Sequence, residues 1–430
     1  SSVATAVMIK PTAGRALALK ALVAIEEQGA YANRILNSLF AEGKPEAQEK
    51  SLATELVFGT LRHLNLIDFL LNRLLTKELS GLPAAIRGVL RLSLYQLRFT
   101  SHPAYAVVNE AVALIKHGKY GGLARLVNAV LRNYLRQQQA MEETLPAFAD
   151  DSLAHLVIVH SHPRWLVERW VDRFGAETIH QLVSANNLPA PLSVRTNTLL
   201  ISREKLLAAF ADAGIEAIPP ETVPEALRLR SGRELTNLPL WDAGYFYLQD
   251  EASMLVAHLL APEPGEVIAD LCAAPGGKTT HLAQLMENTG QIFALDQYSH
   301  KTSLIAENAR RLQIGIIQPI TADAREWCPE QPVDGILLDA PCTGTGVLRR
   351  RPDIRWRRQP ADLRELVSLQ ETLLNQAALM LKPGGRLVYS TCSLETEENE
   401  QQIHNFLAAH PNFRVEIPQD FAAHFNGQRL

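Results

Sequence analysis

The 430-residue chain is 47% hydrophobic and 20% charged, which is typical of globular protein, and it is long enough for two or three domains. Every apolar run is broken well before 18 residues, which argues against a transmembrane helix, and Ser1–Lys10 lacks the charged start and apolar centre of a signal peptide. The four cysteines form no Cys-x-x-Cys pair, which argues against a zinc or redox-pair site. We therefore expect a cytoplasmic protein with free thiols and no metal.

The charge is divided unevenly along the chain. Residues 1–140 carry 17 Lys and Arg against 9 Asp and Glu, whereas the remainder carries 25 against 37. A basic module joined to an acidic remainder is typical of a protein with a polyanionic partner, but a solvated helical surface would have the same composition. Charge by itself leaves these two interpretations open.

The first part of the chain is predicted to be all-α. Apolar residues recur there at helical spacing, and Gly- and Pro-containing breaks separate the segments. The expected helices are Thr12–Gln28, Lys50–Leu75, Leu82–Phe99, Ala106–His117 and Gly122–Gln139. The polar, acidic stretch Gln137–Asp151 is expected to be a linker.

The pattern then changes to a small α+β module. Helices are expected at Trp165–Phe174, Ala176–Asn186 and Ser202–Ala213, and short strands at Leu192–Asn197, Ile215–Pro219 and Leu227–Leu229. The remainder alternates strands with helices, which predicts a mostly parallel, doubly wound Rossmann-like sheet. The expected strands are Val267–Leu271, Gln291–Asp296, Gln318–Thr321, Gly335–Asp339 and Arg386–Ser390, and the expected helices are Ser253–Leu260, Lys278–Met286, Ser303–Leu312 and Leu363–Leu381. The predicted domains are 1–145, 146–235 and 236–430.

A glycine-containing loop connects the first of these strands to a helix. Its sequence, Asp270-Leu-Cys-Ala-Ala-Pro-Gly-Gly-Lys-Thr-Thr280, has neither the spacing of a phosphate-binding P-loop nor the Gly-x-Gly-x-x-Gly dinucleotide pattern. Gly276 and Gly277 allow a ligand to approach the backbone, and the helix that follows presents its amides at the same place. In a doubly wound sheet this edge binds ligands.

Two aspartates follow the next strands. Asp296 ends the second strand, where an acidic residue typically binds ribose hydroxyls, and Asp323 follows the third strand and could contact an adenine. Each could instead be an ordinary cap or turn residue. We expect ribose binding for Asp296 and leave both interpretations open for Asp323.

Two of the four cysteines lie where strands of this sheet end. Cys342 belongs to Asp339-Ala-Pro-Cys-Thr-Gly-Thr-Gly after the fourth strand, and Cys392 belongs to Ser390-Thr-Cys-Ser after the fifth. Strand-to-loop exits are where functional residues concentrate. Cys272 and Cys328 are expected to be small buried hydrophobes, as isolated cysteines usually are.

Together, these three motifs resemble the RNA cytosine-5 methyltransferase family, most closely its bacterial branch that acts on small-subunit ribosomal RNA. The resemblance extends to the first domain, where Glu55–Arg62, Leu94–Leu97 and Val127–Arg132 look like a NusB-like RNA-binding domain. It implies S-adenosylmethionine as cofactor and small-subunit ribosomal RNA as partner. The motifs assign cofactor binding to Cys272, Ala273, Ala274, Pro275, Gly276, Gly277, Lys278, Asp296, Asp323 and Asp339.

The resemblance also assigns the chemistry. C5 of cytosine is a weak nucleophile, and addition of a thiolate to C6 makes it reactive, which is covalent catalysis. The family pattern makes Cys392 the nucleophile and gives Cys342 a role in eliminating the adduct, while Asp339 would hydrogen-bond the base or the cofactor's amino group. DNA cytosine methyltransferases attack through the Pro-Cys cysteine, so the presence of both cysteines favours the RNA family. A free thiol has a pKa of about 8.5, so Cys392 should need local activation.

An arginine-rich segment follows the Pro-Cys loop. Arg349, Arg350, Arg351, Arg355, Trp356 and Arg357 combine phosphate-binding and base-stacking side chains, which favours contact with a single-stranded or flipped-out nucleotide. A solvated charged loop is the ordinary alternative.

Other functions remain to be compared with this one. They are the same chemistry on transfer RNA, a non-catalytic RNA-binding factor with a vestigial cofactor fold, and a small-molecule methyltransferase. We expect a monomer without DNA or membrane partners. Family members usually continue to a final strand with an aromatic Gly-Phe-Phe-type motif, and the sequence up to Leu430 does not contain it.

Overall fold

The computed structural model describes residues 11–230 and 235–418, so the segment Ser1–Lys10 and the residues after 418 lie outside the described part. The chain divides into two compact units. The first contains residues up to Pro189 and the segment Leu348–Arg358, and the second contains Ala190–Val347 and the residues from Gln359 onward. The division falls inside the expected 146–235 module. The expected helices Trp165–Phe174 and Ala176–Asn186 belong to the first unit, whereas the third helix and the strands belong to the second.

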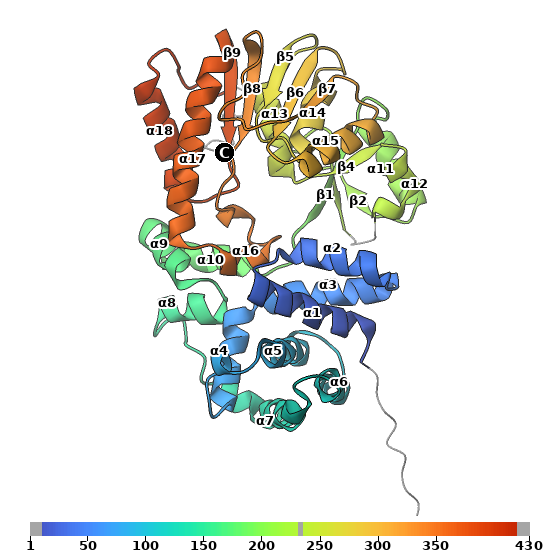
Figure 1. Cartoon of the computed structure of the whole chain (residues 1–430), viewed down its shortest axis with the longest axis vertical. Helices are drawn as coiled ribbons and strands as arrows, with labels where there is room; N and C mark the ends of the chain where they lie inside the picture. The colour runs from blue at the N-terminus through green and yellow to red at the C-terminus, as the bar shows by residue number, and fades with distance from the viewer. Residues whose placement is uncertain (1–10, 231–234, 419–430) are drawn as a thin grey trace, which may run out of the picture. The chain divides into compact units, whose positions relative to one another are not determined.

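The first unit is all-α, as predicted (Figure 1). Its helices are α1 (Ala13–Gln28), α2 (Ala32–Gly43), α3 (Ala47–Arg62), α4 (Leu64–Leu74), α5 (Ala84–Phe99), α6 (Ala104–Lys116), α7 (Ala124–Glu142), α8 (Ser152–Ala154), the π-helix η3 (His155–Val159), α9 (Arg164–Phe174), α10 (Ala176–Asn186) and α16 (Pro352–Arg357).

Two predictions about these helices were wrong. The expected helix Lys50–Leu75 is two helices, because the backbone leaves the helical region at His63 (φ −114°, ψ 21°). The stretch Gln137–Asp151 is not a free linker, since α7 continues to Glu142 and Phe148 stacks on His180 with ring centroids 4.6 Å apart. The sequence analysis also missed α2.

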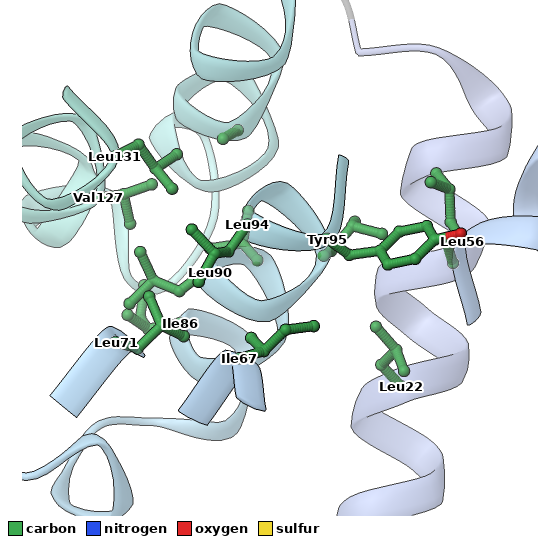
Figure 2. Close-up of a cluster of buried hydrophobic side chains, with 14 of the residues drawn as sticks. Leu22, Leu56, Ile67, Leu71, Ile86, Leu90, Leu94, Tyr95, Val127 and Leu131 are labelled. Carbon is green, nitrogen blue, oxygen red and sulfur yellow. The ribbon is translucent and has the colours of Figure 1, made fainter. Parts of the chain in front are cut away.

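A single apolar cluster holds helices α1 to α7 together. Figure 2 shows Leu22 and Leu56 from α1 and α3 converging with Tyr95, Leu90 and other side chains from α5. Leu56 and Leu90 are fully buried. Truncating one such leucine to alanine typically costs about 2–5 kcal/mol, so this cluster carries much of the unit's stability.

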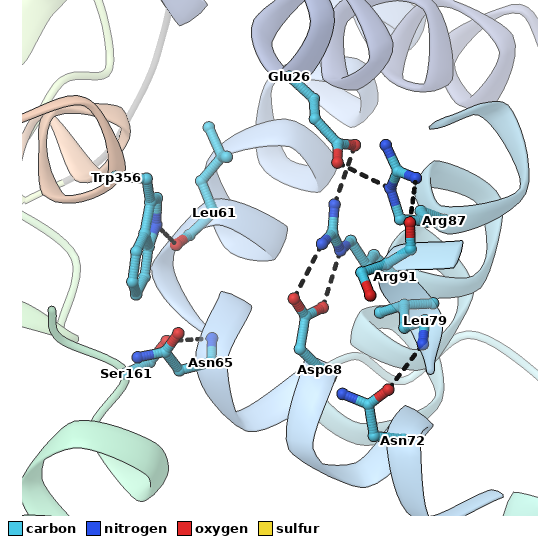
Figure 3. Close-up of polar contacts among 11 residues, drawn as sticks. Glu26, Leu61, Asn65, Asp68, Asn72, Leu79, Arg87, Arg91, Ser161 and Trp356 are labelled. Carbon is cyan, nitrogen blue, oxygen red and sulfur yellow. Dashed lines mark hydrogen bonds and ion pairs between the residues drawn. The ribbon is translucent and has the colours of Figure 1, made fainter. Parts of the chain in front are cut away.

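A polar network ties α1, α4 and α5 at the edge of that cluster. Arg91 makes two hydrogen bonds to Asp68, at 2.7 and 2.8 Å, and a third of 3.0 Å to Glu26, which also binds Arg87 (Figure 3). Two parallel hydrogen bonds from one guanidinium to one carboxylate fix the orientation of the pair and also stabilise it.

The second unit contains a small antiparallel sheet of order β2-β3-β1-β4. Its strands are β1 (Leu192–Thr196), β2 (Ala217–Ile218), β3 (Ala226–Leu229) and β4 (Phe246–Leu248), with α11 (Arg203–Asp212) and α12 (Pro239–Asp242). Val194 pairs with Leu227 on one side and with Leu248 on the other. The three expected strands are confirmed, and β4 was missed.

The larger sheet of this unit is parallel throughout, with the order β7-β6-β5-β8-β9 (Figure 1). The strands are β5 (Val267–Asp270), β6 (Gln291–Asp296), β7 (Ile317–Thr321), β8 (Val333–Asp339) and β9 (Leu381–Ser390). Helices α13 (Glu251–Leu260), α14 (Gly277–Leu285) and α15 (Ser299–Arg311) pack on one face, and α17 (Pro360–Met380) and α18 (Glu400–Ala409) pack on the other. The doubly wound prediction is confirmed.

In the described part of the chain, no helix is long and apolar enough to cross a membrane.

Candidate active site

The chemistry-bearing residues of the second unit gather where the parallel strands end. Asp270 ends β5, Asp296 ends β6, Asp339 ends β8 and Ser390 ends β9. Asp339 and Ser390 occupy paired positions on neighbouring strands. The carboxyl edge of an open α/β sheet is its usual ligand-binding crevice.

The glycine loop makes a close turn from β5 into α14. Gly276 has φ +104°, a region that side-chain-bearing residues rarely adopt, so a substitution there would strain the turn. A Cβ on Gly277 would lie 3.0 Å from Cε1 of Tyr247, so the Tyr247 ring would have to move by a few tenths of an ångström to accept a side chain there. The loop therefore has a bare backbone, without side chains, where α14 begins.

Asp270 adds a buried acceptor to the loop that the sequence analysis had not assigned. Its Oδ2 accepts a 2.7 Å hydrogen bond from Thr279 Oγ1, while its buried Oδ1 has no hydrogen-bond partner among the described residues. Burial raises the pKa of Asp270 to about 7, and the nearby Asp339 carboxylate acts in the same direction. An unpaired buried oxygen beside a bare backbone loop suits a ligand that brings its own donor.

The two other predicted cofactor acids differ in their surroundings. Asp296 accepts a hydrogen bond from the Tyr298 amide (3.1 Å), and its Oδ2 lies 3.6 Å from Lys301 Nζ. Asp323 is bound by Arg325 through the guanidinium and the amide, and these bonds lower its pKa. The carboxylate of Asp323 already has donors, so its proposed adenine contact would have to coexist with Arg325.

The polar groups at this edge of the sheet fit the functional groups of S-adenosylmethionine. The bare loop at the start of α14 suits the carboxylate of an amino acid, because helix N-termini favour anions. The carboxylates of Asp270, Asp296 and Asp339 suit an ammonium group, a sulfonium and ribose hydroxyls.

The two motif cysteines lie in contact. Sγ of Cys342 is 3.2 Å from Sγ of Cys392, and the Cys392 amide lies 3.3 Å from Sγ of Cys342. Cys392 is exposed, whereas Cys342 is half-buried. The nucleophile assigned by motif is thus the more accessible of the pair.

This contact shifts the pKa values of the two thiols in opposite directions. The thiol of Cys342 hydrogen-bonds the Cys392 sulfur and lowers the pKa of Cys392, and the Lys278 cation acts in the same direction against burial. The same hydrogen bond, together with burial, raises the pKa of Cys342. These opposite shifts favour Cys392 over Cys342 as the thiolate of the pair, and the thiolate is the reactive form of a cysteine.

Lys278 and Asp339 form a pair beside the sulfurs. Lys278 Nζ lies 2.5 Å from Asp339 Oδ2, and Asp339 Oδ1 accepts a 2.8 Å hydrogen bond from Ser390 Oγ. Burial would lower the pKa of Lys278, but the Asp339 carboxylate raises it on balance, so the lysine stays charged. The salt bridge fixes the Asp339 carboxylate between the glycine loop and the cysteine loops.

A buried carboxylate absent from the sequence analysis joins the two cysteine loops. Glu398, fully buried, accepts hydrogen bonds from the Thr343 amide (2.8 Å), Thr343 Oγ1 (2.5 Å), Ser393 Oγ and Gln370 Nε2 (3.0 Å). Thr343 and Ser393 directly follow the two cysteines. Glu398 therefore acts as a positioning residue for the two cysteine loops. In the sequence, the only signal for it is that it lies six residues after the cysteine of the Thr-Cys-Ser motif.

The loops also touch through their backbones. The Gly346 amide donates to the Cys392 carbonyl at 2.8 Å, and a Cβ at Gly346 would lie 2.9 Å from that oxygen. The Leu394 amide donates to Thr345 Oγ1 at 2.9 Å. Gly346 thus permits the close approach that brings Cys342 and Cys392 together.

A second residue that sequence reasoning missed is Arg195, on β1 of the small sheet. Its buried guanidinium donates to the Gly277 carbonyl (2.6 Å), Thr280 Oγ1 (2.8 Å) and Gln284 Oε1 (3.2 Å), and also binds Gln249. Burial lowers its pKa to about 10. The small sheet thereby anchors the start of α14, where the cofactor loop ends.

Two of the residues predicted to contact RNA make hydrogen bonds to backbone carbonyls of the protein. Arg355 is fully buried and donates to the carbonyls of Ser161 (3.0 Å) and Asn186 (2.9 Å). The Trp356 indole donates to the Leu61 carbonyl at 2.7 Å, as Figure 3 shows. The expectation for Arg355 was wrong, because its guanidinium is buried and already binds backbone oxygens, whereas base stacking by the half-buried Trp356 stays a prediction.

The other arginines of that set keep partial exposure. Arg349 donates to the Pro189 carbonyl at 2.6 Å, Arg357 lies over the Tyr31 ring at 3.8 Å, and Arg351 is 3.4 Å from Asp353. Together with Arg350 they remain the predicted RNA contacts.

The remaining cysteines differ from one another. Cys272 is partly buried against the apolar layer under α17, and burial raises its thiol pKa. Cys328 is exposed and accepts a contact from Gln376 Nε2 at 3.1 Å, so the expectation that it is a buried hydrophobe was wrong.

Comparison with known families divides the chain into three matched regions. Residues 12–136 match the NusB family, residues 162–236 match the ferredoxin-like domain of RsmF/B-like methyltransferases, and residues 257–428 match the family described as 16S rRNA methyltransferase RsmB/F. The matches agree with the helical first unit, the small sheet and the parallel sheet.

Individual relatives match over almost the whole chain. "Probable ribosomal RNA small subunit methyltransferase B" of Bacillus subtilis is 38% identical over 95% of this chain and 91% of its own length. Ribosomal RNA small subunit methyltransferase B of Klebsiella pneumoniae is 37% identical over 93% and 90%. The crystal structure of the protein PH0851 superposes with a TM-score of 0.78 at 28% identity, covering 95% of this chain and 93% of that one.

Proposed function

Because this chain belongs to the RsmB/F family of 16S rRNA methyltransferases, we propose that it methylates C5 of a cytosine in small-subunit ribosomal RNA through a covalent bond from Cys392 to C6. The observation that carries the proposal is the contact between the two sulfurs at the sheet edge. A thiol whose pKa is lowered and a thiol whose pKa is raised, with their sulfurs 3.2 Å apart, suit the two roles that the chemistry requires.

The cofactor supplies an electrophilic methyl group. Its carboxylate end would be held by the bare backbone of Gly276 and Gly277, and its donors by Asp270 and Asp296. The Lys278–Asp339 pair lies between this pocket and the sulfurs, so Asp339 can accept a hydrogen bond from the base or from the cofactor's amino group.

The reaction begins when the Cys392 thiolate adds to C6, which moves electron density to C5. C5 would then form its bond to the methyl group as the bond between that methyl and the sulfonium sulfur breaks, with S-adenosylhomocysteine as the leaving group. This splits one difficult substitution into easier steps. Because a base inside a helix cannot reach a sulfur held at a sheet edge, the target cytosine has to be unpaired or flipped out.

Release requires C5 to pass its proton to a base, which at the exposed Cys392 can be water, while the bond between Cys392 Sγ and C6 breaks. The departing sulfur becomes a thiolate again, and the Cys342 thiol stabilises it through the same hydrogen bond that lowers its pKa. Cys342 is therefore suited to assist elimination, and Cys392 is suited to both attack and leave.

The test is to incubate the chain with methyl-labelled S-adenosylmethionine and undermethylated small-subunit ribosomal RNA, then digest the RNA to nucleosides. Label in 5-methylcytidine is expected for the wild type and for C328A, an exposed-cysteine control. C392A should retain RNA binding and lose methylation. Unchanged methylation by C392A would remove Cys392 from the mechanism, and label found only with transfer RNA would refute the ribosomal substrate.

A further inference from the structure

Three histidines of the first unit gather at a place that the methyltransferase reaction does not use. His155 is the first residue of the π-helix η3, His160 directly follows it, and His180 lies on α10. One ring nitrogen from each lies within 4.8 Å of the others. All three side chains are half-buried, so solvent ions can reach them.

The π-helix is what brings the first two together. In an α-helix, residues five apart lie about 140° apart around the axis, so a His-x4-His spacing does not form a metal site. Here the His160 amide donates to the His155 carbonyl five residues earlier, which places the two residues nearly above one another. The sequence analysis missed the pair for this reason.

A hydrogen bond fixes which ring nitrogen of His155 carries the proton. Nδ1 of His155 lies 2.8 Å from the Pro146 carbonyl, which can only accept, so Nδ1 carries the proton. In the neutral ring, Nε2 then has a free lone pair. A backbone carbonyl on the second nitrogen is the usual outer partner of a metal-binding histidine. Within the described residues, the rings of His160 and His180 make no hydrogen bonds.

The ring spacing is compatible with one ion. Around a tetrahedral Zn²⁺ with Zn–N of about 2.1 Å, ring centroids lie roughly 5.2 Å apart and nitrogens roughly 3.4 Å apart. The observed centroid separations are 4.9, 5.0 and 5.5 Å. Aromatic packing gives similar centroid distances, but it does not require three nitrogens to converge. Small ring rotations would close the remaining nitrogen gap.

We propose that His155, His160 and His180 form a binding site for a divalent transition-metal ion such as Zn²⁺, with solvent as the fourth ligand. Imidazole is a preferred ligand of such ions. The ion would tie η3 to α10 and stabilise the turn whose Ser161 carbonyl binds Arg355. It would be a structural ion of the first unit and take no part in methyl transfer.

Another cluster serves as an internal comparison. Glu225, His258 and His281 also converge, but both imidazoles bind the Glu225 carboxylate, at 2.7 Å for His258. The ring nitrogens that face the carboxylate are therefore already engaged without an ion. A variant of His258 therefore tests whether the metal binds to this second cluster instead of to the three histidines of the first unit.

The experiment is Co²⁺ and Zn²⁺ titration of the untagged, chelator-stripped full chain. One equivalent is expected, with a visible cobalt spectrum that lacks sulfur-to-metal charge transfer. H160Q and H180Q should weaken binding by more than about a hundredfold, since even outer partners are worth up to that factor. H258Q and H117Q, the latter at an exposed site, should bind as the wild type does.

Two further measurements distinguish loss of the metal site from misfolding of the variants. Zn²⁺ should raise the Tm of the wild type and both controls, but not of H160Q or H180Q, because an ion stabilises only the state that binds it. In the wild type, Zn²⁺ should shield His155, His160 and His180 from acylation by diethyl pyrocarbonate, as mapped by mass spectrometry. Absence of binding, thiolate charge transfer, or binding that survives H160Q and H180Q would each overturn the proposal.

Discussion

Replacing Glu398 with alanine tests whether the cysteine pair depends on its buried carboxylate. The substitution would leave two buried N–H groups without an acceptor: the Thr343 amide, and the N–H of Gln370 Nε2 that does not bind the Pro341 carbonyl. Each stranded donor costs about 1–3 kcal/mol, so we expect E398A to lower the free energy of unfolding by about 4 kcal/mol. That is a large part of the roughly 5–15 kcal/mol that typically stabilises a folded protein.

Glutamine at the same position should rescue most of this loss. Its amide oxygen can keep the bonds from the Thr343 amide and Gln370, and its NH2 can donate to the hydroxyls of Thr343 and Ser393, which then act as acceptors. Only the charge assistance of these bonds disappears, so we expect E398Q to cost about 1–2 kcal/mol.

Activity should follow the same order. In E398A the loops that carry Cys342 and Cys392 lose their common anchor, and a misplacement of about 1 Å can cost about a hundredfold in rate. We expect kcat to fall by that factor while the KM for RNA stays unchanged. The assays are urea unfolding followed by circular dichroism and methyl transfer to ribosomal RNA, with E365A as a control at an exposed site of α17. Wild-type stability and kcat in E398A, or equal damage from E398Q, would refute the hydrogen-bond argument.

Three further predictions follow from individual contacts. C342A should raise the pKa of Cys392, because the hydrogen bond that lowers it is lost; the pH midpoint of Cys392 alkylation, followed by peptide mass spectrometry, should move upward, and a midpoint that stays or falls would contradict this. R195K should destabilise the chain by about 3 kcal/mol and weaken S-adenosylmethionine binding in calorimetry, whereas the exposed R230K should cost less than about 1 kcal/mol. Burial lowers the pKa of His63 to about 3 from 6.5, so the unfolded chain binds more protons between these values and stability should fall as the pH drops through that window. H63F should flatten the pH dependence of urea unfolding by about 4 kcal/mol across the window, and a slope equal to that of the wild type would refute the assignment.

Much of the fold follows from local patterns in the sequence. The alternation of apolar strands with amphipathic helices predicted the parallel sheet, because a strand buried on both faces and its crossover helix each have a recognisable period. The same patterns placed Asp270, Asp296, Asp339 and Cys392 at strand ends. Boundaries were less certain, and His63 interrupts a helix that periodicity alone made continuous.

The motifs also indicated the cofactor loop and both cysteines, since these residues lie close together in short segments. What the sequence could not show was their mutual contact. The 3.2 Å separation of the sulfurs depends on Glu398 and on the close approach at Gly346, which connect segments about 50 residues apart. The lowered pKa of Cys392 is therefore a property of the folded chain.

The sequence by itself determined the classes of element, the parallel sheet and the residue types at its edge, because period and composition are local. Only the tertiary structure decided which side chains are already engaged. Arg355 looks like an RNA contact in the sequence, yet its guanidinium is buried against carbonyl groups. Conversely, His155 and His160 look unrelated until a π-helix places them together, because side-chain proximity depends on the backbone path and not on spacing alone.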